Sequence, residues 1–407
     1  MNTSKSVTTV DQLHFFELFL AKRNLEPFYT KIINSFSEKI IYDRSIPQKN
    51  YLSKKTIIIK DVPDYLEVEI PNENNSLKIK KISTYEGFAI NIQDYSNINE
   101  YLSENFGKAS RSKLRRYQNR LENCFNISYK TYYGEISQDE FSFLFNELRR
   151  MLEKRFTQKK EDNYELQNWE KYQNLIFPLI NDKKASVFVI YDGPKPIDIC
   201  VNLIYDKLIY SSLSSYDINY AAFSMGSIDM IKLIEWSIEN KFETIDLLKG
   251  YYYYKQKWIN KIYGYQNHFI YDSSSLRCVF HANFKAISSK YFYILFHLLK
   301  RWKFHELYHN YKKKIYKPNL PEIDLNQPIS LSPIQDNDIL SEHELIEIKL
   351  DNSKYDYLKK ALYDFLYSSH ESVNTVKILE HKKKQYSFIF KGKLKNIEVT
   401  YADQTSK

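Results

Sequence analysis

A short turn at Ser224–Ser227 has the residue types of a phosphate-binding segment. It reads Ser-Met-Gly-Ser and opens an expected helix from about Met225 to Asn240. A helix start leaves backbone N–H groups unpaired and carries the positive end of the helix dipole, so it suits a pyrophosphate. Gly226 lets a ligand approach the backbone closely. The candidate cofactor-binding residues are therefore Ser224, Met225, Gly226 and Ser227, with an ordinary Ser N-cap as the alternative.

A second group of candidates follows the strand expected at Thr244–Leu248. Asp246 lies between Ile245 and Leu247, where burying a carboxylate is costly unless it is paired. It could accept a proton from an attacking amine, or hold Lys255 or a backbone turn. Lys255 could bind an anionic donor or stabilise an oxyanion, and Tyr254 could protonate a leaving thiolate. The alternative is that the four tyrosines at 251–254 pack a core.

Tyr216 and Asp217 precede the turn at Ser224–Ser227 in a polar loop. Asp217 could serve as a general base. It could equally cap the loop through an Asx-turn. Both roles stay open at the level of the sequence.

A basic helix is expected at Lys108–Arg120, which reads KASRSKLRRYQNR. As a nucleic-acid patch it would give phosphate contacts and salt-dependent binding. Runs of this kind are more often solvated helix faces.

One further string, His305-Glu306-Leu307-Tyr308-His309, matches the HExxH pattern of zinc peptidases. The basic run at Lys312–Lys314 disfavours a cation nearby, and no third ligand is convincing. We therefore expect no metal, and a zinc peptidase is a distant alternative.

The elements that must position these residues form an alternating pattern from Ala185 onward. Strands are expected at 187–191, 197–204 and 208–213, then a helix at 225–240, a strand at 244–248, a short helix within 250–260 and a strand at 265–271. Upstream, 11–40 is expected to form one or two amphipathic helices. Strands are expected at 56–59, 65–70, 77–82 and 87–92.

Downstream, residues 284–316 are expected to form a long basic and aromatic helix or helix pair. This helix could pack on the protein, pair with a partner or lie on an anionic membrane. Residues 340–407 alternate β, α, β, β after a Pro-marked linker.

The composition bounds the class of protein. The chain has 407 residues, a net charge of +9 and 43% apolar residues, so it is not a disordered chain and is long enough for two or three domains. The positive charge fits an anionic ligand without selecting one. The three cysteines are far apart, and the N-terminus has no apolar signal core, so we expect a cytoplasmic protein.

The loop, helix and strand described above resemble a known family. The resemblance covers roughly residues 105–275 and rests on features that occur in the same order as in the family. These are Tyr216-Asp217, Tyr220, the Ser224–Ser227 turn, Asp246, Gly250, Tyr254-Lys255 and Trp258. The basic segment Ser110–Arg116 also matches. This pattern resembles the GNAT-like family of CelD-like acetyltransferases, which is similar to the FemAB peptidyltransferases.

The resemblance implies acyl transfer from a thioester to an amine, or from an aminoacyl ester in the FemAB branch. It implies that the turn at Ser224–Ser227 holds the pyrophosphate of acyl-CoA (acetyl-CoA). Arg111 and Arg115 would reach an anionic substrate, together with Tyr216. The acceptor would be a small-molecule amine such as an amino sugar or a cell-envelope or exopolysaccharide precursor.

We therefore expect an α/β (α+β) protein of tandem GNAT-like mixed-sheet domains with a small C-terminal α+β unit. The expected parts are 1–107 (N-terminal GNAT-like half), 108–275 (acyltransferase domain), 276–318 (basic amphipathic segment) and 319–407 (linker and small domain). The expected activity is acyl-CoA-dependent N-acyl transfer. The alternatives are a FemAB-type enzyme that uses aminoacyl-tRNA and a non-catalytic binding protein of the same fold.

Overall fold

The computed structural model describes residues 11–44, 53–71, 76–250, 253–302, 311, 314–316, 330–335, 344–350 and 353–401. The chain forms two compact units. Unit 1 comprises Met1–Asn97, Asn202–Ser212 and Ser237–Ile315, and unit 2 comprises Ile98–Val201, Leu213–Trp236 and Tyr316–Lys407. The domain boundaries expected from the sequence stay a prediction.

Unit 1 is built mainly from strands, with one long helix. Its elements are β1 (Asp11–His14), η1 (Glu17–Lys22), β2 (Lys31–Asn34), β3 (Lys39–Asp43), β4 (Thr56–Pro63), β5 (Leu66–Glu69), β6 (Leu77–Asn91), β11 (Thr244–Lys249), α7 (Tyr253–Gln256), β12 (Lys261–Asp272) and α8 (Leu276–Arg301). The strands β9 and β10 contribute residues to both units.

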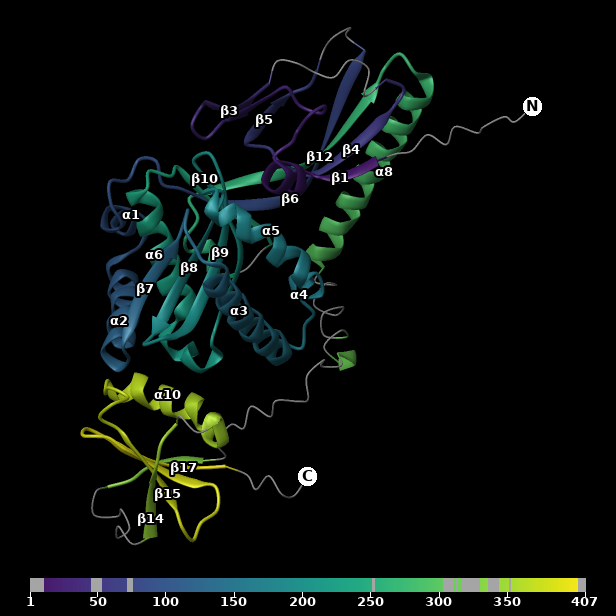
Figure 1. Cartoon of the computed structure of the whole chain (residues 1–407). Coiled ribbons are helices and arrows are strands. Elements are labelled where there is room, and N and C mark those ends of the chain that lie inside the picture. The colour runs from purple at the N-terminus through teal and green to yellow at the C-terminus, as the bar shows by residue number, and fades with distance from the viewer. Residues whose placement is uncertain are drawn as a thin grey trace. The chain divides into compact units, whose positions relative to one another are not determined.

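The large sheet joins strands that lie far apart in the sequence. The strand order of the large sheet is β1-β4-β12-β6-β11-β10-β9-β8-β7. Strand β6 lies between β11 and β12 and pairs antiparallel with both. Strands β2, β3 and β5 form a separate three-stranded sheet. Helix α8 packs along β4, β6 and β12 (Figure 1).

Unit 2 contains the remaining helices and strands. Its elements are α1 (Ile98–Asn105), α2 (Lys108–Cys124), β7 (Ile127–Tyr132), α3 (Gln138–Lys159), α4 (Tyr164–Gln167), α5 (Trp169–Asn181), β8 (Ala185–Asp192), β9 (Lys195–Tyr205), β10 (Leu208–Tyr216), η2 (Ile218–Phe223), α6 (Met225–Glu239, whose last residues fall in unit 1), β13 (Ser330–Pro333), β14 (Leu345–Ile348), η5 (Ser353–Leu358), α10 (Lys359–Ser369), β15 (Lys377–His381), β16 (Ser387–Lys391) and β17 (Asn396–Thr400).

The C-terminal strands form their own sheet, in the order β13-β17-β16-β15-β14, and helix α10 crosses one face of it (Figure 1). The other side of α10 contacts α2 and η2. The ring of Tyr363 on α10 packs edge-on against Phe125 and at a tilt against Tyr220, with ring centroids 4.9 Å and 4.6 Å apart. The C-terminal segment therefore shares one apolar core with the preceding part of unit 2.

The mixed α/β class and the elements from β8 to β12 follow the prediction. The N-terminal prediction was wrong, because residues 11–40 form β1, β2 and part of β3, and only the short segments at Phe15–Phe16 and η1 are helical. Strand β1 pairs with β4 and strand β2 with β5, so distant partners override the local apolar pattern. The two strands expected at 77–82 and 87–92 are the single strand β6.

Candidate functional site

The turn before α6 has an unusual backbone. Ser224 adopts a left-handed conformation, with φ of +56°. Its carbonyl accepts hydrogen bonds from the amides of Ser227 (2.8 Å) and Ile228 (3.4 Å). An N-cap residue normally has an extended backbone, so Ser224 differs from the ordinary cap that was the alternative.

The surface of this turn is open at Gly226. A Cβ atom added to Gly226 would meet nothing within 4 Å, and the residue is exposed. Helix geometry leaves the first amides of α6 without an intrahelical acceptor. Met225 contributes only its backbone here, since its side chain is 1% exposed and packs in the core. The turn thus offers amides and free space, which fits a pyrophosphate held by the backbone.

Asp217 is held by two neighbours. Its carboxylate accepts from the amide of Asn219 (3.1 Å) and from the Lys195 ammonium (2.6 Å), and the side chain is buried. Burial raises the pKa of Asp217, but Lys195 and the Asn219 amide outweigh burial and hold the pKa below its usual value. This geometry favours the capping role that the sequence left open over a general base. Tyr216 lies under the Arg155 guanidinium, 4.8 Å from the ring centroid.

A buried acidic pair escaped the sequence analysis. Asp198 on β9 and Asp229 on α6 are both buried, and the Cys200 thiol contacts both carboxylates, with 3.7 Å to Asp198 Oδ1. Burial, and then the Asp229 charge, raise the pKa of Asp198. Burial also raises the pKa of Asp229, although the hydrogen bond with Cys200 and the Arg155 guanidinium lower it. The signal was present, since Asp198 stands between two isoleucines just as Asp246 stands between Ile245 and Leu247.

The two predicted substrate-binding arginines differ in role. Arg111 Nη1 donates to the carbonyls of Phe106 (2.6 Å) and Ser103 (3.1 Å), so it caps the end of α1. Arg115 lines an open pocket of about 370 Å³. The pocket is formed by one face of α2 together with His370, and its lining residues are Ser112, Arg115, Arg116, Asn119, Arg120, Asn123 and His370.

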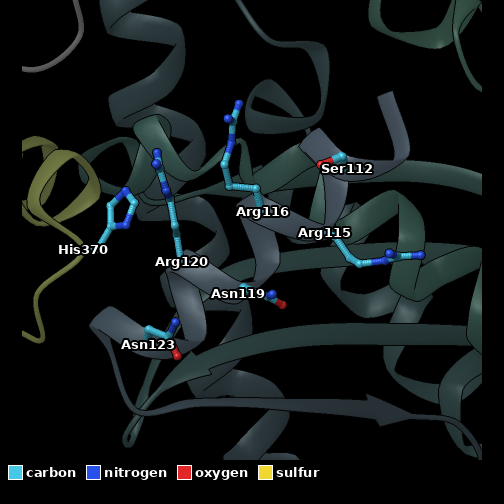
Figure 2. Close-up of a pocket in the computed structure, with 7 residues that line it drawn as sticks. All are labelled: Ser112, Arg115, Arg116, Asn119, Arg120, Asn123 and His370. Carbon is cyan, nitrogen blue, oxygen red and sulfur yellow. The ribbon is translucent and has the colours of Figure 1, made fainter. Parts of the chain in front are cut away.

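The pocket on α2 is cationic. Figure 2 shows Arg116 and Arg120 extending in the same direction, with His370 beside Arg120, while Arg115 points another way. Arg120 lies 4.4 Å from the Tyr367 ring centroid, and its Nε is buried without a hydrogen-bond partner among the described residues. No described carboxylate forms an ion pair with these arginines. A pocket of this kind suits a phosphate or carboxylate.

The Asp246 side chain lies in a buried cluster of tyrosines in unit 1. Tyr65 donates to Oδ2 (2.7 Å), Tyr263 lies 2.7 Å from Oδ1 and 2.8 Å from Oδ2, and the Leu248 amide donates to Oδ1 (2.7 Å). Burial raises the pKa of Asp246 to about 6, although the hydrogen bonds from Tyr263, Tyr65 and Leu248 lower it. A carboxyl group with this pKa can change protonation state near neutral pH.

Lys255 lies close to the same cluster and is 6% exposed. Its ammonium donates to the Leu247 carbonyl (2.5 Å) and approaches the Lys249 carbonyl (3.4 Å). Burial lowers the pKa of Lys255 to about 8, against the attraction of the Asp246 carboxylate. Through these two contacts, Lys255 stabilises the end of β11.

Two sequence candidates lie outside what the structure describes. They are the side chain of Tyr254 and the HExxH string at 305–309. The remaining candidates fall in different units. Asp246 and Lys255 belong to unit 1, whereas Arg111, Arg115, Tyr216, Asp217 and the Ser224–Ser227 turn belong to unit 2. Within the described ranges, no cluster of three or more His, Cys, Asp or Glu residues could hold a metal.

The comparison with known families bears on this part of the chain. Residues 108–256 match the acetyltransferase (GNAT) domain family. This match confirms the resemblance to GNAT-like proteins over those residues, which include the turn before α6 and the strand that carries Asp246. No curated protein matches the chain.

Several solved structures show distant likenesses. FemX is 12% identical, with 53% of this chain and 72% of FemX covered and a TM-score of 0.38. The structure of L-PGS from Bacillus licheniformis is 16% identical, with 57% and 73% covered and a TM-score of 0.34. A conserved protein of unknown function from Bacteroides thetaiotaomicron is 12% identical, with 54% and 71% covered and a TM-score of 0.36.

Proposed function

We propose that the protein is an acyl-CoA-dependent N-acyltransferase that holds its acyl donor at the start of α6. This proposal rests on the open turn at Gly226, which lies inside the segment that matches the acetyltransferase (GNAT) domain family. The backbone amides of Met225 and Gly226 would bind the donor pyrophosphate, and the absence of a side chain at Gly226 gives it access.

The reaction balances without any further reactant. The bound thioester supplies the acyl group. An amine nitrogen attacks the thioester carbonyl carbon, the C–N bond forms, the C–S bond breaks, and the thiolate leaves with a proton. The proton lost by the amine goes to a base. A basic or water-linked group of the protein would take this proton. Asp246 is fully buried and engaged by Tyr65 and Tyr263, so its contacts support the structural role that was its alternative.

Other predicted residues position the site or take part in proton transfer. The contacts of Asp217 and Lys255 support positioning roles, since each charge is engaged by neighbours in its own unit. Tyr254 stays a proposed proton donor to the leaving thiolate. The acceptor we propose is a small amine, such as an amino sugar or a cell-envelope or exopolysaccharide precursor, as the family resemblance implies.

The cationic pocket on α2 favours one second candidate, a FemAB-type transferase that takes its acyl group from aminoacyl-tRNA. Arg115, Arg116 and Arg120 offer cations without carboxylate partners among the described residues. Binding to tRNA through such cations weakens steeply with salt. Tight, salt-sensitive tRNA binding without acyl-CoA binding would therefore select this second candidate.

Isothermal titration with acetyl-CoA and with a longer acyl-CoA tests the main proposal. The Gly226→Trp variant should weaken binding by at least about tenfold, because the indole fills the space above the turn. Gly107→Trp is the matched control, since Gly107 also lies at the start of a helix, as the N-cap of α2, and also faces open space. Equal binding by both variants, or no binding by the wild type, would remove acyl-CoA as the donor at this turn.

A further inference from the structure

Helix α8 has an exposed apolar face that runs its whole length. Leu276 is 86% exposed, Phe280 69%, Tyr291 67% and Trp302, just after the helix, 68%. At about 100° per residue, the positions i, i+4 and i+8 fall on one side of a helix. The residues of this outer face are Leu276, Phe280, Phe284, Ile287, Tyr291, Ile294, Leu295, Leu298 and Trp302.

The opposite face of α8 fixes how the helix is rotated. Cys278, Ala282 and Ala286 are buried, and their small side chains let the helix lie close to β4, β6 and β12. His297 adds a hydrogen bond to the Thr84 carbonyl (2.6 Å). Since this inner face is occupied, the outer face cannot turn toward the sheet without breaking these contacts.

The charges along α8 all have one sign. Residues 276–302 contain no Asp or Glu. The basic residues Arg277, Lys285, Lys290, Lys300 and Arg301 are all exposed. Arg277, Lys290 and Arg301 each stand next in sequence to an outer-face residue, so they border the apolar stripe on both sides.

We propose that the outer face of α8 lies on an anionic lipid membrane, with the helix parallel to the surface. Large apolar and aromatic side chains on one face and Lys or Arg beside them are the properties of helices that sit at the headgroup boundary. Each bordering cation adds attraction to anionic headgroups. An apolar patch of this length is unusual on a surface that faces only water.

The basic residues that border the outer face disfavour a dimer formed through it. In a two-fold dimer through this face, the identical basic borders would meet each other, and like charges across an interface are costly. Among the helices that the structure describes, none combines the length and the hydropathy that a bilayer-spanning segment requires.

Vesicle flotation of the full chain tests this proposal. Vesicles containing one third phosphatidylglycerol should carry the protein, and pure phosphatidylcholine vesicles should carry much less. The double variant Phe280→Asp, Leu295→Asp should reduce binding by at least about tenfold, because it places carboxylates in the apolar stripe. Phe143→Asp on α3 is the matched control, since Phe143 is an exposed aromatic on another helix.

Charge reversal separates the two parts of the proposal. The double variant Lys290→Glu, Arg301→Glu leaves the apolar stripe intact. It should weaken binding to anionic vesicles by about tenfold or more. Both double variants should keep the wild-type circular dichroism and melting temperature. No flotation of the wild type would overturn the proposal. In that case, a concentration-dependent dimer that light scattering detects in the wild type without lipid, and not in Phe280→Asp, Leu295→Asp, would assign the outer face to a dimer interface instead.

Discussion

The Tyr263 hydroxyl lies within hydrogen-bond distance of both carboxylate oxygens of Asp246, at 2.7 Å and 2.8 Å. It also lies 2.7 Å from the hydroxyl of Tyr265, so one phenol joins the carboxylate to a second phenol. Asp246 and Tyr265 are both fully buried. Hydrogen bonds from these donors stabilise the buried carboxylate of Asp246. Burial nevertheless raises the pKa of Asp246 to about 6.

Asp246 should make stability depend on pH in a defined direction. Because the folded-state pKa lies above the unfolded value, the folded protein binds the proton more tightly. The free energy of unfolding therefore falls as pH rises from the unfolded-state pKa of Asp246 to its folded-state pKa of about 6. Between pH 5 and pH 7.5 the wild type should lose about 1 kcal/mol of unfolding free energy from this group.

Urea denaturation at the two pH values measures this effect. Asp246→Asn should remove that part of the pH dependence, since an amide does not titrate there. Asp139→Asn, at an exposed position in the first turn of α3, should leave the pH dependence unchanged. An unchanged pH dependence in Asp246→Asn would show that the carboxyl group titrates normally.

The sequence predicted Asp246 as a buried carboxylate but could not identify its donors. Tyr65 is far from it in the chain, and β6 separates β11 from β12 in the sheet. No local pattern reveals that insertion. The same limit explains the error at residues 11–40, whose strands are defined by pairing with β4 and β5. The segment from β8 to β12 was predictable because its apolar periods are clean and Gly193, Pro194 and Gly250 mark the ends of β8 and β11.

Arg111 and Arg116 should separate structure from anion binding. Arg111→Ala removes two hydrogen bonds to the end of α1 and should cost about 1–2 kcal/mol of stability. Arg116→Ala should change stability by less than about 0.5 kcal/mol, because Arg116 is exposed.

Thermal denaturation with added tripolyphosphate reads out both effects. The anion should raise the Tm of the wild type and of Arg111→Ala, and should raise that of Arg116→Ala clearly less. An equal rise in all three proteins would show that the pocket on α2 does not bind the anion.

The C-terminal helix should contribute to the stability of unit 2. Leu366 is fully buried in the cluster that also contains Phe125 and Phe223. Leu366→Ala should therefore cost about 3 kcal/mol in urea denaturation. Leu394→Ala, at a 74% exposed position, should cost less than about 0.5 kcal/mol. A small effect at Leu366 would mean that α10 does not pack on this core in solution.

The acidic pair Asp198 and Asp229 shows what a sequence conceals even when its signal is present. Each residue lies beside isoleucine in an apolar element, yet only the fold brings β9 and α6 together around Cys200. Ser224 is similar, because its left-handed backbone depends on the junction of η2 and α6. The sequence could predict the turn and its glycine, but not the geometry of the peptide groups.

The most direct test of the central claim compares two acyl donors by titration of the full chain. Acetyl-CoA carries the pyrophosphate that the start of α6 should hold, whereas S-acetylpantetheine carries the same thioester without the pyrophosphate and the nucleotide attached to it. Our account predicts micromolar binding of acetyl-CoA and binding of S-acetylpantetheine weaker by at least about a hundredfold, since about 3 kcal/mol of contacts to the pyrophosphate and its nucleotide are lost. Equal affinity for the two donors, or no binding of acetyl-CoA, would contradict it.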